Sequence, residues 1–381
     1  MVITNGLVFT DECRFARLDL EYNEGRIIRL APAGSLADQS SLDAEGGFVL
    51  PGFVDIHTHG CAGGDFSSAT AEEMEKMLAF YGRRGVTSVI GTTMSLPPAA
   101  LQRAMETAKP FCGADGRGAT LRGLRLEGPF LSPGKKGAQK EEHLIPSLSP
   151  SSYELFEALY SASGEHVRIL DIAPELPGGP AFIQKAARKT VVSLAHTEAD
   201  YEQCAEAFKQ GATHLTHLFN GMPPFHHRHP GPIGAASDYA SFVELICDGV
   251  HLHPSVVRSV FQWFGESRIC LVSDSMSATG MSPGRYTLGG QEVLLENEAA
   301  TLADGTLAGS VSTLTECCRK AVHYGVPIEQ AVRAATLNPA MAAGLVREVG
   351  TLTPGKRADI LLWNQDLLNV HVIAGGETVF H

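Results

Sequence analysis

The sequence predicts an α/β protein with a (β/α)8 TIM-type barrel and a small β-sandwich domain formed by the N- and C-terminal segments. In the middle of the 381 residues, eight short apolar runs rich in β-branched residues alternate with helix-like segments. Together these units span about 230 residues, close to the roughly 250 that are typical of such a barrel. Both ends of the chain have a different pattern of short strands and turns. An open doubly wound sheet is the alternative that the same alternation allows.

The two ends of the chain share a β-rich pattern. Residues 1–48 contain short alternating segments, and Asn-Glu-Gly at 23–25 is typical of a hairpin turn. Residues 346–381 contain two further strand-like segments with Pro-Gly and Gly-Gly turns. We therefore expect 1–48 and 346–381 to meet in one small β domain, and 49–345 to form the barrel.

The middle of the chain supplies the elements of the barrel. Its expected strands are residues 49–56, 87–93, 121–127, 166–173, 190–195, 212–218, 242–248 and 268–274. Helix-like segments lie at 70–84, 98–109, 181–188, 199–210, 254–265, 311–324 and 327–344. A β-hairpin insertion is expected at 285–310.

Composition limits the function classes. The net charge of −12 argues against a general nucleic-acid binder, because such proteins carry a basic footprint. No apolar run reaches the length of a membrane span, and the first residues lack a signal-peptide pattern. Eight scattered cysteines without a CxxC pair do not suggest a disulfide framework. We therefore expect a cytoplasmic protein with a small-molecule partner, and neither a nucleic-acid nor a membrane partner.

The segment VDIHTHG places two histidines at the end of the first expected barrel strand. His57 and His59 are two residues apart, so in an extended strand both imidazoles point to the same side. Two such imidazoles can share a metal ion, but this spacing is also compatible with two hydrogen-bonded histidines at a strand end.

Polar residues also follow several other expected strands, and in a barrel the chemistry lies at these carboxyl ends. They are Glu127 after the third strand, His196 after the fifth, His217 after the sixth, His251 after the seventh and Asp274 at the end of the eighth. Each one alone has an ordinary structural explanation, such as a helix cap. Because one face of a barrel would gather all of them, we interpret the constellation as a metal-dependent hydrolase.

This set of residue types indicates a particular chemistry. Imidazole and carboxylate ligands suit Zn²⁺ or Fe²⁺, and a catalytic site keeps one position open for water. Asp274 can take a proton from that water and deliver it to a leaving nitrogen. His251 can polarise the scissile carbonyl.

Longer segments carry a family resemblance. They are PGFVDIHTHG (51–60), LEGPFLSPGKKGA (126–138), AHTEAD (195–200), THLFNGMPPFHHRHPGPIGAA (216–236), DGVHLHP (248–254), LVSDSMSATG (271–280) and LAGS (307–310). On these segments the chain resembles the amidohydrolase superfamily and, within it, the N-acetylglucosamine-6-phosphate deacetylase family. The resemblance runs nearly from end to end and implies hydrolysis of N-acetylglucosamine 6-phosphate to glucosamine 6-phosphate and acetate.

The resemblance also implies metal ligands. Glu127, His196 and His217 match the ligands of the principal divalent metal, zinc or iron. His57 and His59 are candidate ligands of a second ion, so the resemblance leaves one or two ions open.

For the substrate, the resemblance implies a further set of residues. Asp274 matches the general base and acid, and His251 matches a histidine that contacts substrate near its acetyl group. Asn220, Gly221 and Arg228 match the segment that holds the sugar phosphate. In the family the equivalent of Arg228 can reach a neighbouring subunit, which implies a homodimer.

Two positions depart from the family pattern. Gln139 stands where many members have a histidine that helps to hold phosphate, so the strictness of the 6-phosphate requirement is open. Gly221 replaces the alanine of the family's FNAMPP segment, which leaves the backbone N–H free to approach an anion. The preference between the N-acetylglucosamine and N-acetylgalactosamine substrates is also open.

Two other functions remain as alternatives. One is another amide or ring hydrolase of the superfamily, of the dihydroorotase or isoaspartyl-dipeptidase type. Many of these bridge two metals with a modified lysine from the fourth strand, but the fourth strand here, RILDIAPE, has no lysine. The other is an inactive barrel that serves as a scaffold, and it would be marked by lost ligands.

Overall fold

The structure, a computed structural model, describes residues 1–36, 41–114, 116 and 118–380 and confirms the barrel. Eight parallel strands follow one another in chain order around it, unlike an open doubly wound sheet, in which the order reverses. The strands are β6 (Phe53–Thr58), β9 (Val86–Thr93), β10 (Thr120–Glu127), β11 (Val167–Ile172), β12 (Val191–Leu194), β13 (His214–Leu215), β14 (Phe242–Ile246) and β15 (Ile269–Val272). Asp274 donates its backbone N–H to the carbonyl of His57 at 2.9 Å, which joins the last strand to the first.

The first expected strand, residues 49–56, is divided between two sheets. β5 (Phe48–Pro51) belongs to the small terminal sheet, whereas β6 belongs to the barrel. Gly52 lies between them, where a Cβ atom would be only 2.1 Å from Thr87 Oγ1. The chain therefore passes from one sheet to the other at a close contact that only glycine permits.

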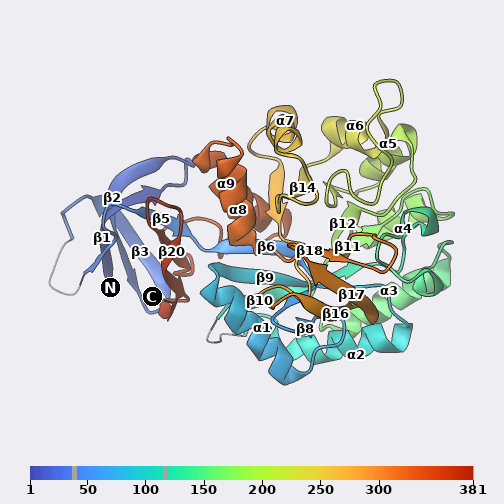
Figure 1. Ribbon diagram of the computed structural model, residues 1–381, viewed down its shortest axis with the longest axis horizontal. Coiled ribbons are helices and arrows are strands. Elements are labelled where there is room, and N and C mark those ends of the chain that lie inside the picture. The colour runs from blue at the N-terminus through green and yellow to red at the C-terminus, as the bar shows by residue number, and fades with distance from the viewer. Residues whose placement is uncertain (37–40, 115, 117, 381) are drawn as a thin grey trace.

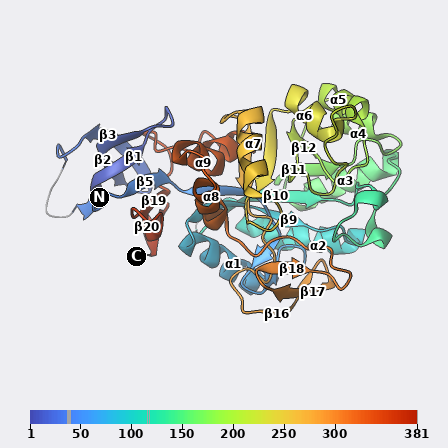
Figure 2. The same cartoon turned by 45° about the horizontal axis from the view of Figure 1, so that its top comes forward.

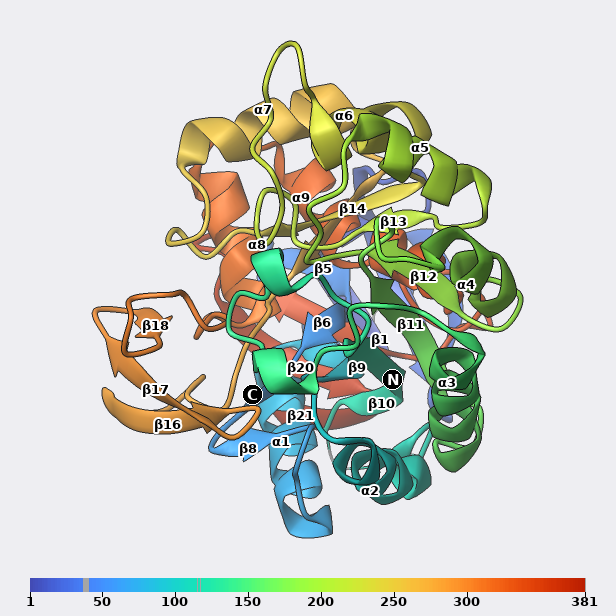
Figure 3. The same ribbon diagram turned by 90° about the vertical axis from the view of Figure 1, so that its right-hand side faces the viewer.

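Helices surround the barrel, as Figure 3 shows. They are α1 (Ala71–Arg83), α2 (Pro98–Ala108), α3 (Pro150–Ala162), α4 (Gly179–Ala186), α5 (Tyr201–Lys209), α6 (Gly231–Tyr239), α7 (Pro254–Phe264), α8 (Leu314–His323), α9 (Ile328–Ala335) and α10 (Leu337–Ala342), with 3-10 turns η1 (Lys109–Phe111), η2 (Pro133–Lys135) and η3 (Glu141–His143). No described helix is long and apolar enough to cross a bilayer.

The structure confirms every expected helix but divides one of them. Residues 327–344 form α9 and α10 with a break at Thr336. Pro339 explains the break, because it has no N–H to donate to the carbonyl of Ala335 and its ring crowds that turn. Sequence patterns did not single out α3 or α6, and the glycines and proline of α6 are poor helix formers.

Both ends of the chain lie in one small sheet, where the N and C labels of Figure 1 are found. Its strands are β1 (Val2–Phe9), β2 (Phe15–Asn23), β3 (Arg26–Pro32), β4 (Leu42–Asp43), β5, β19 (Ile360–Trp363), β20 (Asn369–Ala374) and β21 (Glu377–Phe380). Buried side chains from both ends, such as Val8, Leu20 and Ile373, pack into one cluster. The ends therefore meet as expected, and the domain boundaries at 48/49 and 345/346 stay a prediction.

The expected insertion at 285–310 is a three-stranded antiparallel sheet of β16 (Gly284–Leu288), β17 (Gln291–Glu296) and β18 (Ala299–Thr301). A second small pair, β7 (Gly60–Cys61) and β8 (Gly64–Asp65), follows the first barrel strand. In Figures 1 and 2 the insertion is the orange sheet beside the barrel strands. Ser277 Oγ, which follows the last barrel strand, donates to the carbonyl of Thr287 at 2.6 Å and ties the insertion to the strand ends.

Candidate active site

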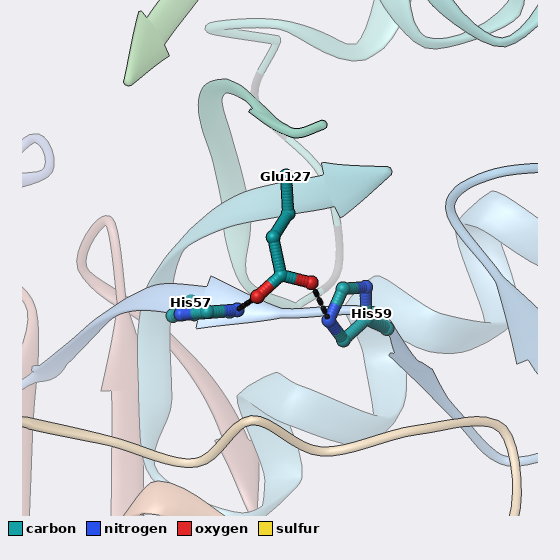
Figure 4. A group of neighbouring side chains, drawn as sticks. All are labelled: His57, His59 and Glu127. Carbon is teal, nitrogen blue, oxygen red and sulfur yellow. Dashed lines mark ion pairs between the residues drawn. The ribbon is translucent and has the colours of Figure 1, made fainter. Parts of the chain in front are cut away.

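Glu127, at the end of β10, lies between His57 on β6 and His59 just after that strand, as Figure 4 shows. Its Oε1 atom is 3.4 Å from His57 Nε2, and its Oε2 atom is 3.2 Å from His59 Nε2. All three side chains are buried. The strand places both imidazoles on one side, and the carboxylate faces both.

The same carboxylate also faces two histidines from the opposite side of the barrel. Glu127 Oε1 is 3.2 Å from His196 Nε2 and 3.1 Å from His217 Nε2, and these two nitrogens are 3.2 Å apart. Glu127 therefore belongs to two groups whose ligand atoms lie within 4.8 Å of one another: one with His57 and His59, and one with His196 and His217.

The donor set fits a divalent cation. His57 Nε2 and Asp274 Oδ1 are buried at the centre of the cluster, and neither has a hydrogen-bond partner. A buried polar atom without a partner costs about 1–3 kcal/mol, and a cation bound between the side chains would satisfy these atoms. Imidazole nitrogens and carboxylate oxygens are the ligands that zinc and iron accept in proteins.

The electrostatics of the cluster are those of a cation site. Burial disfavours a charge on His57 and His59, but the carboxylates of Asp274 and Glu127 outweigh burial and raise the pKa of His57 to about 9 and that of His59 to about 10. Burial acts to raise the pKa of Glu127, whereas the surrounding histidines hold that pKa well below its usual range. The two carboxylates therefore create a field that favours positive charge between them.

Three residues of the cluster, each just after a barrel strand, have an unusual backbone conformation. The φ angles are +43° at His196, +25° at His217 and +48° at Asp274. Residues other than glycine are uncommon in this region, although histidine and aspartate enter it more often than most, and such conformations cluster at functional sites. Nothing in the local sequence indicates these angles, because each residue follows an ordinary strand pattern.

A cavity of about 250 Å³ opens beside the cluster. Of the residues that the sequence predicted for substrate, Gln139, Asn220, Gly221 and His251 line it. Sequence reasoning did not identify Met94, Leu288 and Thr306, which also line the cavity. The hairpin insertion was predicted, but no local pattern showed that it would reach the barrel mouth.

Gln139 is buried at the base of the cavity, against the candidate metal ligands. Its side chain is buried, its Nε2 donates to Glu127 Oε2 at 2.9 Å, and its Oε1 accepts the backbone N–H of Ser95 at 2.7 Å. The Gln139 amide is therefore bonded directly to the carboxylate that both histidine groups share.

Gly221 adopts a conformation that suits glycine. Its φ is +62°, and a Cβ atom there would lie 2.9 Å from His196 Nδ1. Glycine therefore fits this turn without strain, and it lets the chain pass directly against one of the candidate ligands.

A carboxylate orients His251. Its Nδ1 donates to Asp248 Oδ2 at 2.7 Å, and the backbone N–H of His251 donates to Asp248 Oδ1 at 2.9 Å. Burial lowers the pKa of His251, but the Asp248 carboxylate outweighs burial and the net pKa is raised. Its Nε2 is left for the cavity, where it can donate a hydrogen bond only when the imidazole is protonated.

Within one chain, the structure does not bring Arg228 to this cavity. Arg228 is exposed on the loop before α6, where its Nη1 contacts His227 Nε2 at 2.8 Å. It lines a separate hollow beside the start of α5. Of the predicted site residues, Arg228 alone lies apart from the cluster and its cavity.

Comparisons with known proteins agree with this geometry. The model of the amidohydrolase family matches residues 48–379. The N-acetylglucosamine-6-phosphate deacetylase of Bacillus subtilis is 36% identical over 87% of this chain and 84% of its own. The N-acetylgalactosamine-6-phosphate deacetylase of Escherichia coli O157:H7 is 35% identical over 85% of each chain.

A solved structure extends the likeness to the fold. The N-acetylglucosamine-6-phosphate deacetylase of Mycobacterium smegmatis, solved as an aspartate-to-alanine variant with N-acetylglucosamine 6-phosphate, superposes with a TM-score of 0.93. It is 33% identical, and the match covers 100% of this chain and 99% of the other. With the family match across the barrel and these identities, the chain belongs to the amidohydrolase family, among its N-acetylhexosamine-6-phosphate deacetylases.

Proposed function

We propose that this protein hydrolyses the N-acetyl group of N-acetylglucosamine 6-phosphate and releases glucosamine 6-phosphate and acetate. The observation that carries the proposal is Glu127, which is shared by two histidine groups at the mouth of the barrel beside Asp274. The similarity to curated deacetylases of such substrates supports the choice of substrate.

Binding of a divalent metal, zinc or iron, belongs to this proposal. Glu127, His196 and His217 would hold the principal ion, and His57 and His59 would hold a second ion with Glu127. When bound, such an ion polarises a carbonyl oxygen and makes a water molecule acidic enough to react near neutral pH.

The chain's own residues would then manage the protons. Asp274 would accept a proton from the attacking water through its carboxylate and deliver that proton to the amide nitrogen that leaves. His251 would donate a hydrogen bond from Nε2 to the acetyl oxygen as negative charge develops on it. Both side chains line the same cavity, which supports their action on one ligand.

The Asp248–His251 pair gives a pH prediction. Because Asp248 raises the pKa of His251, the donating imidazolium persists to higher pH and is lost as pH rises through that raised pKa. In Asp248→Asn the carboxylate is gone, the pKa of His251 falls, and the high-pH limb of kcat/KM is expected to move to lower pH. A pH–rate profile checks this, and an unchanged high-pH limb would contradict the role of the pair.

We also propose where the sugar phosphate binds. Gln139, Asn220, Gly221 and His251 would contact the ligand in the cavity, and Arg228 would act from a second subunit. Supporting a homodimer, Arg228 lies on an exposed loop with Phe225, whose ring is 5.5 Å from that of Trp263. Phe225 and Trp263 are 45% and 49% exposed, so an apolar surface beside this loop is available to a second subunit.

The cytoplasm is the compartment that this proposal favours. All eight cysteines carry free thiols in the described structure, and seven of the eight are buried. Free buried thiols are typical of proteins that fold in a reducing compartment.

Acetate release from a panel of N-acetylhexosamines, each with and without a 6-phosphate, tests the proposed function. We expect N-acetylglucosamine 6-phosphate to be strongly preferred over the free sugar. We also expect a chelator to abolish acetate release. The galactosamine isomer belongs in the panel, because a relative named for that substrate is 35% identical. Equal rates on the free sugars would exclude the phosphate preference, and no release from any compound would favour an inactive scaffold.

A further inference from the structure

A layer of buried polar side chains crosses the barrel beneath the candidate metal ligands. Arg125, on β10, donates to both oxygens of Asp171 on β11, at 2.7 and 2.8 Å. Its Nη1 donates to Glu244 Oε1 on β14 at 2.5 Å. Thr216 bridges the layer, accepting from Arg125 at 2.9 Å and donating to Asp171 at 2.7 Å. All four side chains are fully buried.

Glu244 connects this layer to the candidate metal centre. Its second oxygen, Oε2, is 3.0 Å from His57 Nδ1. Because an ionised carboxylate only accepts hydrogen bonds, Nδ1 carries a proton, so a neutral ring that binds a metal has its lone pair on Nε2. That Nε2 has no hydrogen-bond partner, and it faces Glu127 Oε1 at 3.4 Å.

The charges in the layer do not balance. Asp171 and Glu244 contribute two negative charges, and Arg125 contributes one positive charge. One negative charge is left, and it faces His57 through Glu244 Oε2. A carboxylate behind a histidine fixes the ring orientation and makes the opposite nitrogen a stronger metal ligand.

The imidazole rings of the other candidate ligands have no comparable support, although the backbone N–H of His217 donates to Glu244 Oε2 at 3.5 Å. His196 Nδ1 donates to the backbone carbonyl of Lys135 at 2.7 Å, which is a neutral acceptor. In the described structure, His59 Nδ1 and His217 Nδ1 are buried without a hydrogen-bond partner. Of the four histidines, His57 therefore has the charged support, and His57 belongs to the group that would hold the second ion.

We propose that Glu244 is a positioning residue that holds His57 as a metal ligand and thereby sets the affinity of the second metal site. The inference rests on the metal binding in the proposed function. It assigns control of the second site to a layer of the barrel interior that would touch neither substrate nor metal. Arg125 would keep Glu244 ionised and in place, and Asp171 would hold Arg125 from the far side.

Metal binding to two matched variants tests this proposal. Glu244→Gln and Asp171→Asn each neutralise one carboxylate that is paired with Arg125, but only the first faces His57. Zinc titration of metal-free protein by calorimetry, with metal content by elemental analysis, separates the two sites. We expect Glu244→Gln to weaken the second ion by about 10–100-fold and to keep the principal ion, whereas Asp171→Asn keeps both.

Three outcomes would overturn the proposal. They are equal loss of the second ion in both variants, wild-type affinity in Glu244→Gln, and a wild-type protein that binds only one ion. Thermal unfolding of each metal-free variant shows whether it is folded.

A measurement on the wild-type protein keeps the proposal testable if neither variant folds. In metal-free protein with ¹⁵N-labelled histidine, at a pH high enough for the ring to be neutral, NMR reports which ring nitrogen of His57 carries the proton, assigned by the signal lost in His57→Gln. We expect a proton on Nδ1, and a bare Nδ1 would overturn the proposal. The deacetylase function fails separately, by absent acetate release, so the two failures are distinguishable.

Discussion

Asp274→Asn is expected to lower turnover by at least about a hundredfold, the usual size of an acid–base contribution, and to leave the metal content unchanged. An asparagine amide can neither take a proton from water nor deliver one to a leaving nitrogen. Its carbonyl oxygen keeps the place of Asp274 Oδ1, which is 3.3 Å from His59 Nε2, so the cation environment loses a charge but no donor.

Steady-state acetate release and elemental analysis of the same preparation check this result. Asp238→Asn, at an exposed position on α6, is a control for the loss of an aspartate elsewhere on the chain. Turnover close to that of the wild type would remove Asp274 from its proposed role. Loss of both metal and activity would show that Asp274 is a metal ligand instead.

Much of this site follows from the sequence because a barrel gathers the carboxyl ends of its strands. Glu127, His196 and His217 are far apart along the chain, but each follows an apolar run, so a closed parallel sheet brings them to one rim. The patterns of β-branched residues identified all eight strands. The convergence was therefore predictable once the number and order of the strands were known.

Other features depend on tertiary contacts that local patterns do not contain. The positive φ angles of His196, His217 and Asp274 are set by the surrounding structure and not by residue type. The approach of Gln139 to Glu127 depends on the fold of the loop after β10. Helix α6 forms from a glycine- and proline-containing segment because its Ile233 face packs into the core.

The polar layer beneath the site is an intermediate case. Arg125, Asp171 and Glu244 each interrupt an apolar strand with a charge, and a charge within a buried strand is rare unless it is paired. That pattern was a usable signal that the barrel interior contains an ion-pair network. The partners could not be predicted, because Glu244 and His57 are 187 residues apart in the sequence.

Glu127→Gln is expected to have the largest effect of any single substitution at this site, because Glu127 belongs to both groups of candidate ligands. The amide removes the negative charge that faces four imidazoles, and it presents an N–H₂ group where a ligand oxygen was. We expect loss of both ions. Loss of metal assistance worth several kcal/mol corresponds to a fall in turnover of at least about a thousandfold.

Removing that charge also changes the protonation of the histidines, which gives the prediction a second measurement. Glu127 helps to raise the pKa of His59 to about 10, so the pKa of His59 falls in Glu127→Gln, and NMR titration of metal-free protein detects the change. Gln139→Leu is the matched control, since it removes the hydrogen bond to Glu127 Oε2 but keeps the carboxylate, and it should retain both ions. A Glu127→Gln protein that still binds two ions would show that the imidazoles hold them without a shared carboxylate. Glu127 would then not be the shared ligand on which the assignment of this site depends.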